Sequence, residues 1–308
     1  DIMKIQNELK KRIFILDGAM GTEIKRNIQL KDKQLNEELN IINPEIIKKI
    51  HREYIKAGAD IIESNTFNSN EMALQNSKFK GKSYELSFEG VMLAKEAAKE
   101  YKNIYVAASI GPTNKSLFLE KNDCTFDVKK NEFIKDIKGQ IAGVIDADPD
   151  LILLETVYDS LNLEIMLEVI KYNFNKKNKQ IPIIVSLTVG ENRKIFSGES
   201  FDEIIEKVDT EDIIGYGINC SYGSEKLINL IEQIALNNRK LMIVYPNAGL
   251  PDSNGNYKET PEIFSKYMEK IMRNNKVNIV GGCCGTTSEY IKILSNSSKN
   301  YLPKDFEI

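Results

Sequence analysis

Short apolar runs rich in isoleucine, valine and leucine recur along the chain, and longer amphipathic stretches separate them. These runs are almost continuously hydrophobic, without the alternation of a strand that has one solvated face. Parallel strands covered on both faces show this pattern. The sequence therefore predicts eight buried strands, at residues 13–19, 60–67, 104–111, 151–157, 182–189, 213–220, 241–248 and 277–284.

The stretches between the apolar runs carry hydrophobic residues at helical spacing. In residues 44–57, Ile46, Ile50 and Tyr54 fall on one face, and Pro44 takes the first helical position, where proline is tolerated. The same spacing predicts further helices at residues 87–101, 132–147, 160–174, 201–208, 225–236 and 261–274.

A series of strand–helix units favours a parallel sheet with right-handed connections, and eight units favour closure. We therefore expect a single (β/α)8 TIM barrel over residues 1–308, with irregular insertions at 29–40 and 114–130. A doubly wound open sheet is the alternative, but no Gly-x-Gly-x-x-Gly follows the first strand. The chain starts at Asp1, so it is also expected as a possible module of a larger protein.

Composition narrows the classes of partner. Among 308 residues the net charge is −3, so no basic field indicates nucleic acid or an anionic membrane as a partner. No apolar run approaches the roughly 20 residues of a membrane span. Four cysteines, two of them adjacent, do not indicate a disulfide framework in a chain of this length. Together these features predict a cytoplasmic protein with metal-binding or catalytic cysteines.

The cysteines stand at the carboxyl ends of predicted strands, where barrel enzymes build their active sites. Cys283 and Cys284 are adjacent within a glycine cluster, and Cys220 ends another strand. Adjacent residues of a strand point to opposite sides, so both can face one ion only after the strand has turned. Three thiolates suit Zn²⁺ with a fourth position open. The alternative is that they are small buried hydrophobes, an interpretation we keep for Cys124.

Acidic residues occupy other strand ends. Asp17 and Glu155 are expected to face one pocket, as an acid–base pair or as partners of an ammonium group, and Glu63 has a similar setting. Asp17 is alternatively a turn residue before Gly18. The single histidine, His51, lies among lysines and an arginine and is predicted on the solvated surface. A lone histidine argues against a zinc hydrolase with histidine ligands.

Eight segments resemble the homocysteine S-methyltransferase family, most of all the homocysteine-binding module at the N-terminus of cobalamin-dependent methionine synthases. The segments span nearly the whole chain in order, and the GINC and GGCCGT pair is the most specific part. They are ILDGAMGTEI (15–24), AGADIIESNTFNSN (57–70), SIGPTNKS (109–116), LILLETVYD (151–159), GINCSYG (217–223), PNAGLP (246–251), ETPEIF (259–264) and NIVGGCCGTT (278–287).

The resemblance implies that Cys220, Cys283 and Cys284 bind zinc and that the sulfur of L-homocysteine takes the open position. It implies that Asp17 and Glu155 hold the substrate ammonium group. The expected substrate-binding residues are Asp17, Gly18, Ala19, Met20, Gly21, Asn65, Ser109 and Glu155, and Asn247 is the expected fourth zinc ligand in the absence of substrate.

The methyl donor is less constrained by the sequence. The resemblance of GPTNK (111–115) to cobalamin-dependent enzymes favours methylcobalamin, supplied by folate- and cobalamin-binding modules in cis or in trans. A stand-alone enzyme that uses S-methylmethionine or betaine is one alternative. A zinc-binding regulatory barrel without catalysis is another, although all three cysteines and both acids are present.

Overall fold

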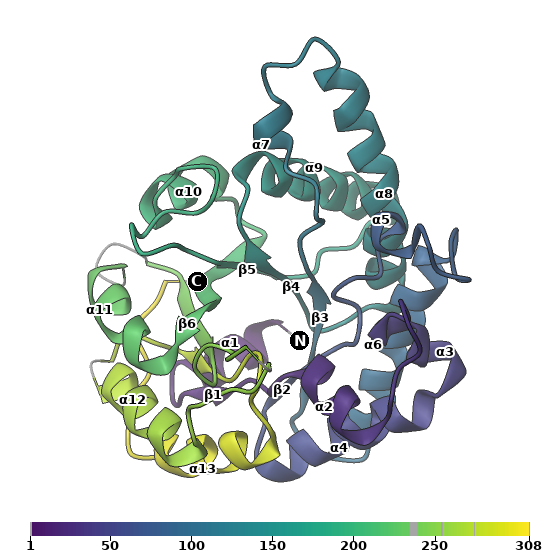
Figure 1. The fold of residues 1–308 in the computed structure, drawn as a ribbon. Helices are drawn as coiled ribbons and strands as arrows, with labels where there is room; N and C mark the ends of the chain where they lie inside the picture. The colour runs from purple at the N-terminus through teal and green to yellow at the C-terminus, as the bar shows by residue number, and fades with distance from the viewer. Residues whose placement is uncertain (1, 235–238, 254, 274, 308) are drawn as a thin grey trace.

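Eight parallel strands close into a barrel in a computed structural model of the protein (Figure 1), which describes residues 2–234, 239–253, 255–273 and 275–307. The sheet order is β1-β8-β7-β6-β5-β4-β3-β2, and a parallel bridge between Leu16 and Ile61 joins its two ends. The predicted (β/α)8 barrel is confirmed, and the open sheet is excluded. The strands are β1 (Phe14–Ile15), β2 (Ile61–Glu63), β3 (Tyr105–Ile110), β4 (Leu151–Val157), β5 (Ile183–Leu187), β6 (Ile213–Gly223), β7 (Leu241–Asn247) and β8 (Ile279–Val280).

Alternate strand residues pack on the two faces of the barrel wall, which explains the continuous apolar runs. In β4, Leu151 and Leu153 belong to the cluster inside the barrel, whereas Ile152 and Leu154 pack outward beneath the helices. Both sides of the strand are therefore dry, so every position favours a hydrophobic residue.

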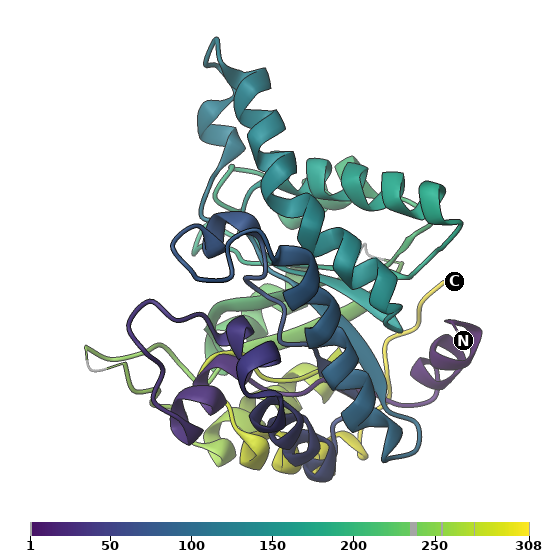
Figure 2. The ribbon, with the colours of Figure 1, turned by 90° about the vertical axis from the view of Figure 1, so that its right-hand side faces the viewer.

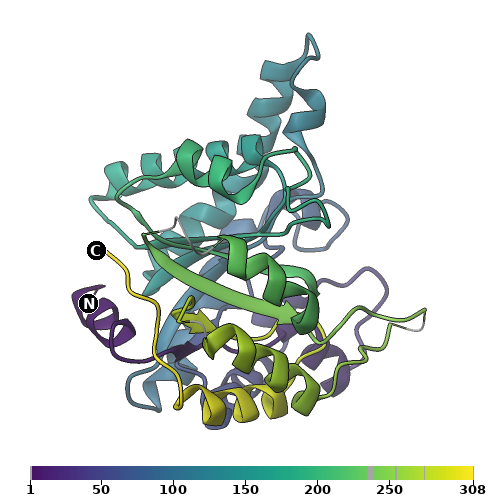
Figure 3. The same ribbon diagram turned by 90° about the vertical axis from the view of Figure 1, so that its left-hand side faces the viewer.

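The helices surround the barrel (Figures 1 and 3). They are α1 (Ile2–Leu9), α2 (Met20–Asn27), α3 (Leu39–Ile42), α4 (Pro44–Ala57), α5 (Glu71–Leu74), α6 (Ser83–Lys99), α7 (Leu117–Glu120), α8 (Phe126–Ala147), α9 (Ser160–Lys177), α10 (Phe201–Val208), α11 (Ser224–Ile234), α12 (Pro261–Arg273) and α13 (Ser288–Ser298), with a 3-10 helix η1 (Asn36–Glu38). The expected ends of two helices, at residues 236 and 274, lie outside the described residues.

The prediction that residues 114–130 form an irregular insertion is wrong for most of that segment. It contains α7 and the first turns of α8, which project beyond the barrel in Figures 1 and 2. Lys129 pairs with both Glu120 and Asp123, so the polar residues of this segment bind one another across the connection. The expected loop 29–40 likewise contains η1 and the start of α3.

Helix α1, which the sequence pattern does not predict, covers the amino-terminal end of the barrel. Its Ile5 and Leu9 are buried and belong to the same cluster as the inward-facing strand residues. Figures 2 and 3 show both ends of the chain on this side of the molecule. No helix among the described residues is long and apolar enough to cross a membrane.

The prediction that His51 is a solvated surface residue is wrong. Its side chain is fully buried in α4, and neither ring nitrogen has a hydrogen-bond partner. Burial alone lowers the pKa of His51 to about 3, because the charged imidazolium would lose its hydration. His51 is therefore a neutral part of the helix–barrel core.

His51 should make the fold sensitive to acid. Its folded-state pKa lies below the ordinary value of 6.5, so its contribution to stability is present above pH 6.5 and is lost as the pH falls toward 3. We expect His51→Leu to gain roughly 2 kcal/mol in free energy of unfolding, relative to wild type, between pH 7.5 and pH 5. Urea denaturation of both proteins at the two pH values measures this, and an equal difference at both would contradict the assignment.

Candidate active site

A layer of polar side chains lies above the apolar filling of the barrel, at the carboxyl ends of the strands. The inward-facing row of β3 continues from Ala107 to Ser109, and that of β4 continues from Leu153 to Glu155. In other strands as well, the position two residues after an inward-facing one also faces inward, and at this height it is polar. The buried polar residues that follow inward-facing positions in this way are Ser109, Glu155, Ser186, Asn219 and Asn247.

The three predicted cysteines meet at this end of the barrel. The sulfurs of Cys220, Cys283 and Cys284 all lie within 4.8 Å of one another, and the three residues are partly exposed. Cys124 is exposed in the connection between α7 and α8 and takes no part, so the prediction that it is a small buried hydrophobe is wrong. The structure thus brings together the three thiols that the sequence pattern selects and separates the fourth.

Backbone turns explain how neighbouring cysteines can face one point. Strand β8 ends at Val280, so Cys283 and Cys284 follow the strand, and Gly285 has a φ of +84° that favours glycine. In β6, Cys220 itself has a φ of +49°, where the pairing with β7 shifts register. The prediction that the strand over residues 213–220 ends at Cys220 is wrong, because β6 continues to Gly223.

The structure joins Cys220 and Cys283 by a disulfide, with 6.0 Å between their Cα atoms. Cys284 remains a thiol, and its Sγ lies 3.8 Å from the Sγ of Cys220. The sequence did not indicate a disulfide framework, but three sulfurs close enough to share a metal are also close enough for two of them to pair. The reduced form is the one that offers three thiolates.

Asn247 ends β7, which lies between the two strands that lead to the cysteines. Backbone hydrogen bonds tie the segments together: the Cys283 amide donates to Pro246 O at 2.8 Å, and the Ala248 amide donates to Cys284 O at 3.0 Å. The Asn247 side chain is buried, and its Oδ1 has no hydrogen-bond partner. An unpaired oxygen beside the cysteine segments fits the expected fourth ligand.

Three carboxyl groups form the second part of the site: Asp17 and Glu155 are buried, and Glu63 is partly buried. Desolvation raises the pKa of Asp17 and of Glu63 well above their ordinary values, and the nearby charge of Glu155 raises both further. Desolvation also raises the pKa of Glu155, to about 7, against the opposing hydrogen bonds from Ser109 and Tyr245. These acids lie near one another in a dry environment, as expected for Asp17 and Glu155.

Hydrogen bonds hold Glu155 in place and connect it toward the cysteines. The Ser109 hydroxyl donates a hydrogen bond to Glu155 Oε1, so Ser109 orients the carboxyl group of Glu155. Asn219 Nδ2 donates to Thr156 Oγ1 at 2.8 Å and lies 3.5 Å from Glu155 Oε2 and 4.0 Å from Cys283 Sγ. The buried Asn219 therefore spans the two parts of the site.

The loop from Asp17 to Gly21 passes beside this layer. Gly18 is required by close packing, since a Cβ there would lie 2.8 Å from both Thr286 Oγ1 and the Tyr54 ring. Helix α2 begins at Met20, and no side chain caps it at Ala19, so its first amides are open to an anion.

Asn65 lies near the acids but uses its amide group locally. Its Nδ2 donates to Asn36 O at 2.9 Å and to Asn40 Oδ1 at 2.8 Å, which fixes the η1–α3 segment. The strand predicted over residues 60–67 ends at Glu63, because the Thr66 amide turns back to Ser64 O.

Several residues at the site were absent from the sequence-based set. Asn219 and Tyr245 contact Glu155, and Tyr257 interacts with the Cys284 thiol and packs its ring against Gly285. Asn219 and Tyr245 lie on inward-facing strand positions, which strand alternation could have identified. Tyr257 comes from the loop after β7, and no periodic signal marks it.

A model of the homocysteine S-methyltransferase family matches residues 14–297. The chain belongs to this family. Among solved structures, the metallated form of the homocysteine methyltransferase MmuM from Escherichia coli superposes with a TM-score of 0.77 at 21% identity, covering 97% of this chain and 100% of that one. The oxidized form of MmuM gives 0.76 at 22% identity, covering 93% and 96%. These likenesses confirm the barrel fold of the family.

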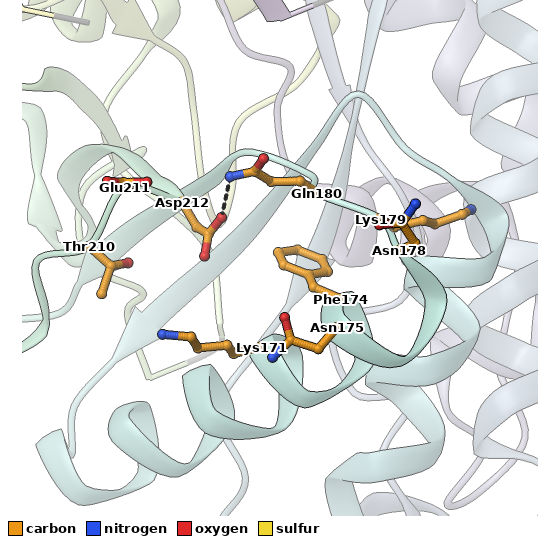
Figure 4. A pocket seen from close by; sticks show the side chains of 9 residues that line it. All are labelled: Lys171, Phe174, Asn175, Asn178, Lys179, Gln180, Thr210, Glu211 and Asp212. Atoms are coloured by element: carbon orange, nitrogen blue, oxygen red, sulfur yellow. Dashed lines mark hydrogen bonds between the residues drawn. The ribbon is translucent and has the colours of Figure 1, made fainter.

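A hollow of about 760 Å³ lies at the opposite end of the barrel (Figure 4). Its walls come from the end of α9 and from residues that precede β5 and β6, including Gln180 and Asp212, which are hydrogen-bonded at 2.8 Å. It therefore opens at the amino ends of the strands and contains none of the expected homocysteine-binding residues.

The raised pKa of Glu155 should make the ligand-free fold less stable as the pH rises. A carboxyl whose folded pKa is about 7 and whose ordinary value is 4.5 contributes stability below pH 4.5, and this is lost as the pH rises to 7. We expect Glu155→Gln to gain roughly 2–3 kcal/mol in free energy of unfolding, relative to wild type, between pH 5 and pH 8. Urea denaturation at both pH values measures it, with the exposed Glu89→Gln as the control. A parallel pH dependence in wild type and Glu155→Gln would contradict the prediction.

Proposed function

We propose that this chain transfers a methyl group to the thiol of L-homocysteine, with Zn²⁺ held by Cys220, Cys283 and Cys284. The observation that carries the proposal is the convergence of three sulfurs within 4.8 Å at the barrel mouth. Family membership supports the reaction class. Homocysteine combines a thiol with an ammonium and a carboxylate group, and the site offers a partner for each.

The donor set fits zinc. Three thiolates and an amide oxygen suit a borderline-soft ion in tetrahedral coordination, and the unpaired Oδ1 of Asn247 supplies the fourth donor when substrate is absent. When bound, the ion would favour the thiolate form of the substrate at neutral pH. The form that would bind zinc is the reduced one, in which Cys220, Cys283 and Cys284 all offer thiolates.

The remaining residues orient the substrate. Asp17 and Glu155 hold its ammonium group inside the barrel, and Ser109 fixes the Glu155 carboxylate by its hydrogen bond. Backbone amides of the loop from Gly18 to Gly21, at the uncapped start of α2, donate to its carboxylate. With both ends of the amino acid bound, the side-chain sulfur is directed to the cysteines at the mouth, where a donor can reach it.

We further propose methylcobalamin as the donor, carried by a cobalamin-binding module alongside a folate-binding one, in cis or in trans. The resemblance of residues 111–115 to cobalamin-dependent enzymes supports this assignment. The second candidate is a stand-alone enzyme using S-methylmethionine or betaine, which the match to the full length of the Escherichia coli chain favours.

Replacing one cysteine of the triad should remove zinc. We expect Cys283→Ala and Cys284→Ala to lose stoichiometric zinc after anaerobic reduction and zinc repletion, because two thiolates leave the shell incomplete. Cys124→Ala, the matched control at the exposed cysteine, should keep about one zinc per chain. Metal analysis with a zinc K-edge spectrum measures this, and the sulfur count should rise from three to four with homocysteine. Full zinc in the triad variants would refute the ligand set.

The methyl donor can be identified by measuring which compound the reduced, zinc-loaded chain uses to form methionine. We expect methionine from methylcobalamin and at least tenfold less from S-methylmethionine or betaine at equal concentration, measured by mass spectrometry. The reverse ranking would replace the cobalamin assignment with the stand-alone enzyme. Cys283→Ala serves as the background control, because it lacks the complete thiolate set.

A further inference from the structure

Glu63 places a third carboxyl group beside the two that are expected to hold the substrate ammonium. It is the last residue of β2. Asp17 follows β1, which is bridged to β2, and Glu155 lies in β4, which is separated from β2 by β3. The Glu63 amide donates to Asp17 Oδ2 at 3.1 Å, which fixes the two residues side by side. None of the ion pairs formed by the described residues includes any of the three acids.

Two oxygens of this cluster are buried without a partner. They are Oδ1 of Asp17 and Oε1 of Glu63, and each has lost water without gaining a donor. The oxygens of Glu155 are more occupied: Ser109 donates to Oε1, and Tyr245 and Asn219 lie 3.4 and 3.5 Å from Oε2. Buried acceptors are normally satisfied, so the unpaired pair indicates a missing cationic donor.

A primary ammonium group matches this arrangement. It carries three N–H donors and a positive charge, and each donor needs its own acceptor once water is excluded. Asp17 and Glu155 can take two of the donors, which leaves the third for another acceptor. We propose that Glu63 accepts it, so that Glu63 is a substrate-binding residue that selects a primary amine. This inference rests on homocysteine being the substrate.

The unpaired carboxyl oxygens should make the site prefer ligands that carry a primary amino group. A ligand without the amino group would leave Oδ1 of Asp17 and Oε1 of Glu63 buried and unpaired, as they are in the free protein. Removing the Glu63 charge would leave one ammonium N–H without its anion. This hydrogen bond between charged groups forms only with ligands that carry the ammonium group, so only those ligands lose affinity when it is removed.

Isothermal titration of the reduced, zinc-loaded chain tests the proposal. The ligands are L-homocysteine and 4-mercaptobutanoate, which keeps the thiol and carboxylate but lacks the amino group. We expect Glu63→Gln to weaken homocysteine binding by roughly 10- to 100-fold and to change the Kd of 4-mercaptobutanoate by less than about threefold. The exposed Glu89→Gln should leave both constants unchanged.

Glu63→Asp provides a second variant that keeps the charge on a shorter side chain, and it should weaken homocysteine binding selectively even if Glu63→Gln does not fold. Equal weakening of both ligands, or none, with zinc still at one per chain, would overturn the role of Glu63 and leave the proposed function standing. A wild-type chain that binds 4-mercaptobutanoate as tightly as homocysteine would overturn the ammonium site itself. Failure of zinc-loaded wild type to bind homocysteine would overturn the proposed function as well.

Discussion

The inward-facing row of each strand is the constraint on which this molecule depends. Apolar side chains fill the lower barrel, and at the same height around the wall the row changes to polar residues. The packed filling holds Glu155 and Asn219 rigidly, which preorganises the site. The same packing excludes water, so the ionised acids carry a desolvation cost that protonation or a bound cation offsets. The site is therefore a local source of instability in a stable scaffold.

Much of this arrangement could be predicted from the sequence. Buried parallel strands need apolar residues on both faces, so their positions are visible as apolar runs, and polar residues at the ends of those runs identify the active face. The cysteine triad follows from the same logic, because Cys220 and the Cys283–Cys284 pair come at or just after the carboxyl-terminal parts of apolar runs, although β6 itself continues to Gly223. The left-handed backbone of Cys220 within β6 has no such signature. It arises where two strands lose register.

The misses have specific physical causes. His51 lies four residues after Ile47 and four before Ile55, both buried, so helical periodicity places it in the core. The charges of Lys48, Lys49 and Arg52 concealed that spacing. Tyr257 reaches the cysteines from a loop, and its contacts depend on how β7 and β8 meet. The environments of His51 and Tyr257 depend on residues that are distant in the sequence, whereas the strands are visible in local sequence patterns.

Helix α1 has a consequence for the order of events at the site. Ile5 and Leu9 complete the apolar filling from below, so among the described residues buried side chains cover the amino-terminal end of the barrel. Under the proposed function, substrate, methyl donor and product would all use the carboxyl-terminal opening. The amino acid would then bind before the donor covers it, and methionine would leave after the spent donor.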